Sequence, residues 1–388
     1  MQISRRHWGA VSAAFITNAV FFGVWAARIP AVAERFAIPH SRLGLLLLLL
    51  AFGALLAFPL AGRLADRHGA LRVTRILVCL NALAMVGLAA APSLGLLAVA
   101  LFVFGACHGA MDVAMNAWAA EVEQAAGKPW MPSFHAMWSL GAGFGALTAA
   151  GAVALGVPYG LHFLLAAALV PVFGLYGTKI SWPTQAPGQI PAETAPLFSL
   201  PRGPLLFAGL LAGFATLGEG AVADWSALYL IEATAAQPHI APLGLTVFSA
   251  AMVGMRLLGG LIIGALGAQR AGLASGIFAL CGTTLLIALP EPMFALAGFM
   301  LMGFGYALAM PLAFSQAGNT PGVPPARAIA SVATLGYGGM LMGPPMIGAL
   351  THVTTLRGAF GLLVLLALGM VLTARGSARR PRRAVSRG

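Results

Sequence analysis

Residues 43–75 read LGLLLLLLAFGALLAFPLAGRLADRHGALRVTR. An uncharged apolar run gives way to a short segment rich in basic residues, after which the chain becomes apolar again. A run of about 20 apolar residues is the length that an α-helix needs to cross the hydrocarbon core of a bilayer. The stretch therefore predicts two membrane-spanning helices joined by a short polar turn.

The composition extends this pattern to the whole chain of 388 residues. Residues of the types AVILMFWYC make up 60% of it and charged residues only 8%, against roughly 25% charged residues in a soluble domain. The apolar runs are continuous, whereas the strands of a membrane β-barrel would alternate apolar and polar residues. We therefore expect an all-α membrane protein and neither a soluble enzyme nor a barrel.

Clusters of Pro, Gly and charged residues divide the chain into twelve predicted spans. They lie at 8–31, 41–63, 71–91, 94–122, 130–156, 158–180, 204–232, 240–266, 270–289, 292–318, 326–350 and 355–375.

The basic residues predict how these spans are oriented. Seventeen of the 22 Lys and Arg residues fall on the side that also holds both chain ends. Four residues, Arg28, Arg35, Arg42 and Arg357, fall on the other side, and Arg256 falls within a span. Because cytoplasmic loops of membrane proteins carry the excess of Lys and Arg, we expect both termini in the cytoplasm. The net charge of +12 is then a topology signal and does not indicate nucleic-acid binding.

The longest polar interval, 181–203, divides the spans into two groups of six. We expect an N-terminal half over 1–180, a cytoplasmic linker over 181–203, a C-terminal half over 204–375 and a basic cytoplasmic tail over 376–388. The tail is expected to be attracted to anionic lipid.

The two halves also show an internal repeat. Two similar six-helix halves with a binding site between them are typical of secondary transporters. A shift of 198 positions aligns Gly62 with Gly260, Gly69 with Gly267 and Arg72 with Arg270.

The segment GRLADRHGALR at 62–72 resembles the signature of the major facilitator superfamily. It agrees at Gly62, Leu64, Ala65, Asp66, Arg67 and Gly69 and departs at Ala70 and Leu71. The sequences of further segments are similar to those of a bacterial branch near the fucose permeases, the YbjJ/MosC-like proteins. These segments are WAARIP at 25–30, MNAW at 115–118, EGAVADWSALY at 219–229 and GPP at 343–345. The resemblance implies the twelve-helix, two-half fold of that superfamily, a place in the bacterial inner membrane and a proton-linked carrier of a sugar-like solute.

The signature segment also predicts a conformational gate. A carboxylate near a helix N-terminus and among arginines gains charge-assisted hydrogen bonds in one state and loses them in another. Alternatively, the arginines only anchor the loop to anionic headgroups. The gate residues are expected to be Gly62, Asp66, Arg67, Gly69 and Arg72.

Ionisable groups within a span are functional candidates because they are costly in hydrocarbon. Glu219 lies half way along its helix between Gly218 and Gly220, which we expect to leave it accessible to water or a ligand. A partly dehydrated carboxylate can take up and release a proton in the physiological range. The residues expected to take part in proton coupling are Glu219, Asp112, Asp224, Arg256 and His108.

Arg256 carries a specific expectation. It lies ten residues from the predicted helix end at Leu266, or about 15 Å at the helical rise, which is deep for snorkelling. We expect it to line the central cavity and to pair with Glu219 or Asp112. If the helix ended earlier, Arg256 would instead be a cytoplasmic anchor.

Other polar and aromatic residues are expected to bind the substrate. His108, Asp112 and Asn116 recur at helical spacing on one face, where they can relay a proton or bind sugar hydroxyls. Each of them has a structural alternative in helix packing. The expected substrate-binding residues are Asn18, Trp25, Asn116, His135, Trp138, Trp225, Tyr306 and Tyr337.

We therefore predict a secondary active transporter that takes up a sugar-like or polyol solute with protons by alternating access. The alternative is a proton-driven exporter of drugs or other hydrophobic molecules. Motifs for nucleotide binding, metal binding and hydrolysis are absent from the sequence, so we expect neither an enzyme, a cofactor nor a metal site. The expected partners are a small-molecule substrate, protons and membrane lipids, with no nucleic acid, and we expect a monomer.

Overall fold

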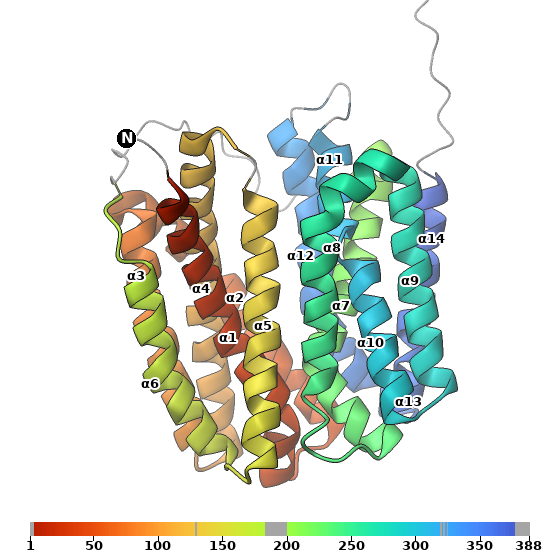
Figure 1. Ribbon diagram of the computed structural model, residues 1–388. Coiled ribbons are helices and arrows are strands. Elements are labelled where there is room, and N and C mark those ends of the chain that lie inside the picture. Colours follow the sequence, from red (N-terminus) through yellow and green to blue (C-terminus); the bar gives the residue numbers. More distant parts are fainter. Residues whose placement is uncertain are drawn as a thin grey trace, which may run out of the picture.

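The computed structural model describes residues 4–128, 130–182, 200–318, 320, 323 and 325–376, and the described part is built from helices. The first group is α1 Arg5–Arg35, α2 His40–His68, α3 Ala70–Ala90, α4 Leu94–Ala126, α5 Met131–Ala154 and α6 Tyr159–Gly177. The second group is α7 Pro204–Thr234, α8 Leu243–Leu266, α9 Ala268–Ala288, α10 Pro292–Tyr306, α11 Ala309–Gly318, α12 Pro325–Leu350, α13 Leu356–Ala359 and α14 Gly361–Gly376. The two groups form two bundles that lie side by side (Figure 1).

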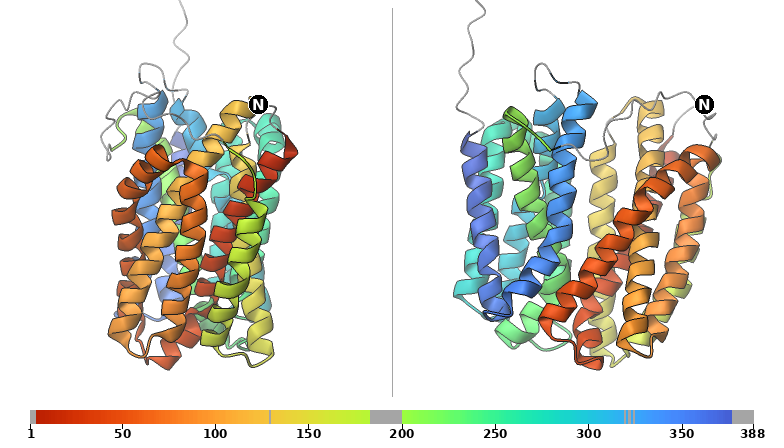
Figure 2. Two further views of the ribbon diagram at one scale, coloured as in Figure 1. Left: turned by 90° about the vertical axis from the view of Figure 1, so that its left-hand side faces the viewer. Right: turned by 180° about the vertical axis from the view of Figure 1, so that it is seen from behind.

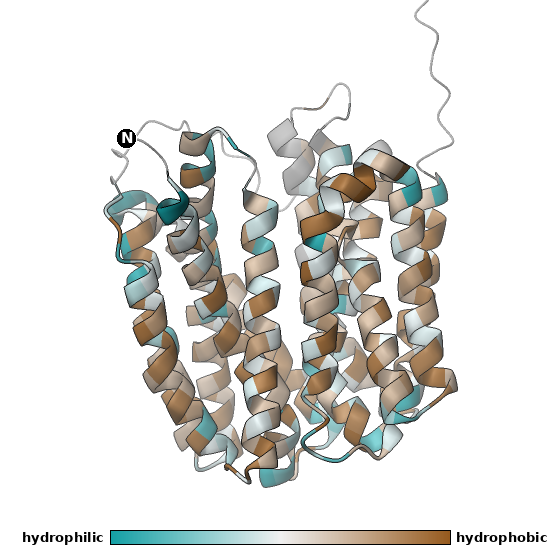
Figure 3. Cartoon of the chain, in the orientation of Figure 1, coloured by the Kyte–Doolittle hydropathy of each residue, from teal (hydrophilic) through white to brown (hydrophobic). Residues whose placement is uncertain are grey.

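The expected all-α membrane fold is confirmed. Eleven helical segments of the described chain are long and apolar enough to cross a membrane. The 26-residue helix α12 is the twelfth long segment and packs along α7 and α2. Apolar residues cover most of each helix, and the strongly hydrophilic ones gather near the ends (Figure 3). Helices suit this environment because they satisfy their backbone hydrogen bonds internally.

Two predicted spans are interrupted. The span expected at 292–318 is divided into α10 and α11 by a turn at Ala307 and Leu308. Pro311 lacks the N–H that would bond to the carbonyl of Ala307, which explains the break. The span expected at 355–375 likewise begins as the single turn α13 and continues as α14 after Phe360.

The repeat glycines occupy equivalent turns. Gly69 follows α2 with φ 87°, and Gly267 follows α8 with φ 78°. Both backbones are in a region that disfavours any side chain, and each glycine joins two consecutive helices. Here the structure corrects the placement of the signature segment. Residues 62–68 form the last turns of α2, so Asp66 lies near a helix C-terminus and not in a loop.

Glycines bring the helices within each half into backbone contact. A methyl group added to Gly105 of α4 would lie 2.8 Å from the Cα of Leu50 in α2. One added to Gly141 of α5 would lie 2.9 Å from the Cα of Ile16 in α1. Small residues allow such close approach, and membrane helices without a hydrophobic driving force between them rely on it.

The two halves meet unequally along their length. We call the end of the bundle where α1 begins and α14 ends the terminus end, and the opposite end the far end. The halves lie closer together at the far end than at the terminus end (Figures 1 and 2). Gly44 at the start of α2 and Gly348 at the end of α12 are in close contact at the far end. The linker and the tail expected over 181–203 and 376–388 lie mostly outside the described residues.

We predict that Gly105→Ala destabilises the protein, because its methyl group must push the α2 backbone away. Overpacking of this kind costs about 1–3 kcal/mol. The matched control is Gly95→Ala on the same helix, since a methyl group there would meet nothing within 4 Å. Thermal unfolding of the purified protein in detergent should show a lower midpoint for Gly105→Ala alone. Equal midpoints for both variants would contradict the packing argument.

Candidate functional site

Arg256 of α8 joins the two halves in the middle of the bundle. Its Nη2 lies 3.4 Å from Oε1 of Glu219 on α7. Its Nη1 donates to Oγ of Ser139 and, at 3.3 Å, to the backbone carbonyl of His135, both on α5. The side chains of Arg256 and Glu219 are only 12% and 14% exposed. One guanidinium therefore contacts an acid of its own half and a helix of the other half.

Arg256 lies within the membrane span, as expected. Helix α8 continues for ten residues beyond it, to Leu266, so the helix does not end early, as the cytoplasmic-anchor alternative would require. The expected pairing with Glu219 is present. A planar guanidinium suits this position because it can donate in several directions while remaining charged.

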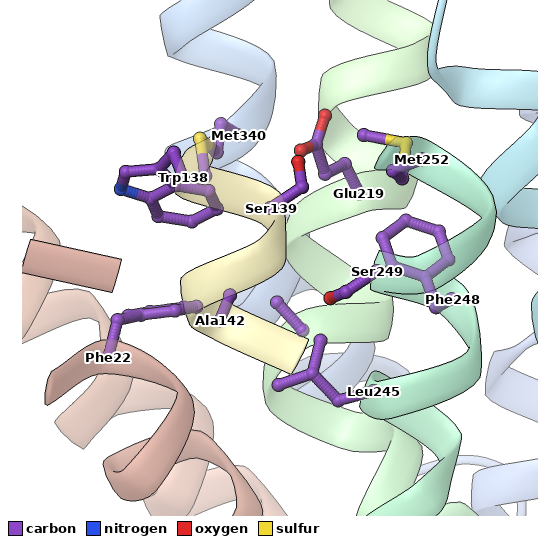
Figure 4. Close-up of a pocket in the computed structure, with 11 residues that line it drawn as sticks. Phe22, Trp138, Ser139, Ala142, Glu219, Leu245, Phe248, Ser249, Met252 and Met340 are labelled. Atoms are coloured by element: carbon purple, nitrogen blue, oxygen red, sulfur yellow. The ribbon is translucent and has the colours of Figure 1, made fainter. Parts of the chain in front are cut away.

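A pocket lies beside this ion pair, between the two halves (Figure 4). Helices α1 and α5 of the first half and α7, α8 and α12 of the second supply its walls. Figure 4 shows the Ser139 hydroxyl next to the Glu219 carboxylate, with the Trp138 ring nearby. The lining residues are Phe22, Trp138, Ser139, Ala142, Glu219, Ala223, Leu245, Phe248, Ser249, Met252 and Met340. The pocket is thus mostly apolar, with Glu219, Ser139 and Ser249 as its main polar residues.

The glycines beside Glu219 do not open it to water as expected. Gly218 faces the buried ring of Tyr306, and Gly220 faces the backbone of Met340 in α12. Their absent side chains make room for neighbouring helices. Glu219 instead borders the pocket on its other side.

A second polar cluster lies in the first half. Asn18 of α1 donates to the backbone carbonyl of His108 on α4 at 3.2 Å and accepts a hydrogen bond from Trp138 of α5 at 3.0 Å. Asn116 donates to the Asp112 backbone carbonyl at 2.8 Å and to its Oδ1 at 3.2 Å. Of the three residues expected to form one stripe on α4, Asp112 and Asn116 bond to each other, and His108 is hydrogen-bonded to α1 through its backbone carbonyl.

His108 makes mostly aromatic contacts. Its ring stacks between Phe22 and Phe104, at 5.6 and 5.8 Å between ring centroids. Its Nδ1 is buried and has no hydrogen-bond partner in the described part of the chain. This environment fits a packing role more closely than the expected relay.

Several expected substrate-binding residues are buried away from the pocket in this conformation. Trp25 and Trp225 are fully buried, and Tyr306 is 2% exposed. Trp225 donates from Nε1 to the carbonyl of Pro344 at 3.1 Å, whereas His135 contributes its backbone carbonyl to Arg256. The side chain of Tyr337 lies outside the described residues.

Asp224 is separate from the Glu219 site. It lies five residues further along α7, is 9% exposed and does not line the pocket. Its Oδ1 is buried without a hydrogen-bond partner among the described residues.

Asp66 does not make the contacts with described arginines that are expected of a gate in this conformation. Asp66 is exposed, and no ion pair joins it to an arginine within the described residues. Arg75, from the same basic segment, instead donates to the backbone carbonyls of Thr178 and Ile180 at the end of α6. Gly69 forms the turn between α2 and α3.

Sequence reasoning missed Ser139. The signal that could have found it is the helical spacing of His135, Trp138 and Ser139, which places all three on one face of α5. Within the described chain, no group of three or more His, Cys, Asp or Glu side chains could hold a metal ion.

Comparisons with known proteins agree with this architecture. The model of the Major Facilitator Superfamily matches residues 10–323. The transporter y4wD of Sinorhizobium fredii is 44% identical over 361 residues, which cover 93% of this chain and 95% of that protein. An MFS-type transporter of Yersinia pestis is 35% identical, covering 94% of each chain. The membrane protein MosC of Rhizobium meliloti is 30% identical, covering 94% of this chain and 88% of MosC.

A solved structure with the same fold is that of the nucleoside transporter NupG, in a form with one substitution. It superposes with a TM-score of 0.76, at 12% sequence identity, over 96% of this chain and all of that one. Identity this low shows the shared fold alone. The family match and the relatives above carry the assignment further: this chain is a multi-pass membrane transporter and belongs to the major facilitator superfamily.

Proposed function

We propose that the protein couples proton movement to the uptake of a small polar solute, sugar-like or a polyol, by alternating access. The observation that carries this proposal is the Glu219–Arg256 ion pair, which borders the pocket between the halves. In this reading the terminus end faces the cytoplasm of a bacterium, as the distribution of basic residues predicts. The expected monomer, lipid contacts and basic tail remain part of the proposal.

The coupling step uses the two sets of contacts that Arg256 makes. Protonation of Glu219 removes its charge and with it the ion pair. The guanidinium then keeps only its bonds to Ser139 and His135 in the other half. Because this changes the contact between the halves, protonation shifts the balance between conformations. A proton and a change of access are thereby linked at one side chain.

The first half supplies groups suited to a polyhydroxylated ligand. Trp138 presents an aromatic surface to the pocket, and such surfaces pack well against the apolar face of a sugar ring. Asp112 and Asn116, on α4 of the same half, offer hydrogen-bond acceptors and donors for the hydroxyl groups of such a ligand. Asn18 fixes the orientation of the Trp138 ring.

One observation favours the alternative of a proton-driven exporter. Phe22, Leu245, Phe248, Met252 and Met340 give the pocket a largely apolar lining, which suits hydrophobic molecules. The same ion pair would then couple protons to export.

A thermal-shift screen of the purified protein discriminates these functions. A ligand that binds the folded state raises the unfolding midpoint by mass action. We expect stabilisation by a sugar or polyol and none by drug-like hydrophobic compounds. Stabilisation by the hydrophobic set alone would favour the exporter and contradict the proposed uptake of a polar solute.

With the ligand identified, we predict that Glu219→Gln loses uphill accumulation and keeps exchange of substrate at equal pH. The neutral amide resembles the protonated acid but cannot release a proton. Transport into proteoliposomes with and without a pH gradient measures both activities. Glu291→Gln, at an exposed carboxylate before α10, is the control and should behave as wild type. Uphill uptake at the wild-type rate in Glu219→Gln would move the coupling role to Asp112.

Arg256→Lys and Arg256→Ala are both expected to impair transport while inserting normally. Lysine keeps the charge but lacks the planar fork that reaches Glu219 and α5 together. Initial uptake rates, normalised to the amount of protein in the membrane, provide the measurement. Wild-type activity of Arg256→Ala would exclude the guanidinium from the mechanism.

Asp66→Asn is predicted to leave substrate affinity within a few-fold of wild type and to slow turnover. The carboxylate is distant from the pocket and acts on the balance between the two conformations. Binding is followed by thermal shift, and turnover by exchange in proteoliposomes. If turnover and the accessibility of the two faces to thiol reagents are both unchanged, Asp66 is not a gate.

A further inference from the structure

His40 and Glu232 connect the two halves at the far end. His40 is the first residue of α2, and Glu232 lies in the last turn of α7. The His40 Nε2 and a Glu232 carboxylate oxygen are 2.8 Å apart. Their side chains are 27% and 37% exposed, so water and protons reach this pair from the far face. It is distinct from the Glu219–Arg256 pair, which is buried in the middle of the bundle.

The other contacts around His40 also form only where the two halves lie close together at the far end. Its ring meets Trp225 edge-on, with 5.7 Å between the centroids, and Trp225 is itself bonded to Pro344 of α12. One turn along α2, a methyl group on Gly44 would lie 3.1 Å from the Cα of Gly348. If the far end opened, His40 would lose its contacts with Glu232 and Trp225. Gly44 would likewise move away from Gly348.

We propose that His40 and Glu232 form a second proton-binding site, on the far face, whose protonation holds the far ends of the two halves together. Histidine is the side chain whose charge ordinarily changes near neutral pH. When neutral, His40 can make one hydrogen bond to Glu232; when protonated, it adds an ion pair and a charge-assisted bond. Because this partner is within reach only when the far end is closed, His40 binds its proton more tightly in the closed state. A fall in pH therefore favours closure.

Glu232 is the one charged group in contact with His40 in the described part of the chain. Helix α12, which packs against α2, carries no charged residue between 338 and 350. The other charged or titratable groups on elements and loops of the far end are Arg28, Glu34 and Arg35 of α1, Arg42 of α2, Tyr159 and His162 of α6, Asp224 and Tyr229 of α7, His239, Glu291, His352 and Arg357.

The experiment measures the far-end distance directly. Spin labels are placed at Leu155, after α5, and at Val353, after α12, which are 82% and 85% exposed and belong to different halves. The three native cysteines are replaced by alanine. Double electron–electron resonance is measured on the full chain in nanodiscs between about pH 8 and pH 5.5. As the pH falls, the population with the short distance between the labels should increase relative to the population with the long distance. We expect the ratio to change roughly two- to five-fold, the range of a partly exposed ion pair.

The measurement is made in the Glu219→Gln background, so that titration of the central site cannot produce the change. In His40→Gln, whose amide keeps a neutral hydrogen bond, the pH response should be lost. His239→Gln, at an exposed histidine between α7 and α8, should keep it. Glu232→Gln should abolish the response as well, which tests the site from the other half.

A pH response that persists in His40→Gln, or its absence from the parent protein, would overturn the proposal. Neither result bears on coupling at Glu219, because the readout is a distance and requires no substrate.

Discussion

The structure depends on keeping one permanent charge, Arg256, stable in the middle of a membrane. A guanidinium cannot shed its proton and is costly in hydrocarbon unless it is fully bonded. Its own half supplies only the carboxylate of Glu219, and the remaining bonds come from α5 in the other half. The charge is therefore stabilised only where the two halves meet. The interface between the halves thus holds the bonds of this charge within otherwise apolar surroundings.

The fold could be predicted from the sequence because its signals are long and repeated. Apolar runs of span length, the excess of basic residues on one side and the shifted glycine pattern each act over many residues. The turn glycines Gly69 and Gly267 stood out through the repeat, and both have a positive φ that few other residues adopt. The break between α10 and α11 was missed because a turn of two residues changes neither length nor hydropathy. It depends on Pro311, and a proline within a span can equally be tolerated.

Site residues could be predicted from the sequence where their type is energetically costly within a membrane span. They could not be predicted where their type is common in such spans. Arg256 and Glu219 stood out as charges within spans, and burial leaves each of them few other partners. Aromatic residues carry no such signal, since Trp25, Trp225 and Trp138 are equally compatible with packing and with ligand contact. Their positions follow from helix rotations that the hydropathy pattern does not determine. Ser139 was missed because a serine in a membrane helix ordinarily bonds to its own backbone.

The contrast between the two kinds of helix contact explains how such a bundle can move. Within each half, helices meet through glycines such as Gly105 and Gly141, where backbones touch and any displacement opens a void or a clash. Between the halves, α5 packs against α8 and α2 against α12, with close backbone contact at Gly44 and Gly348. The described hydrogen bonds across this interface come from few side chains, chiefly Arg256 and His40, which can exchange partners. Halves that are tightly packed within themselves favour two discrete arrangements over gradual deformation, and the polar contacts between them can differ from one arrangement to the other. Both contacts lie at the interface between the halves, so the proposed protonation of Glu219 and of His40 would each change how the two halves meet.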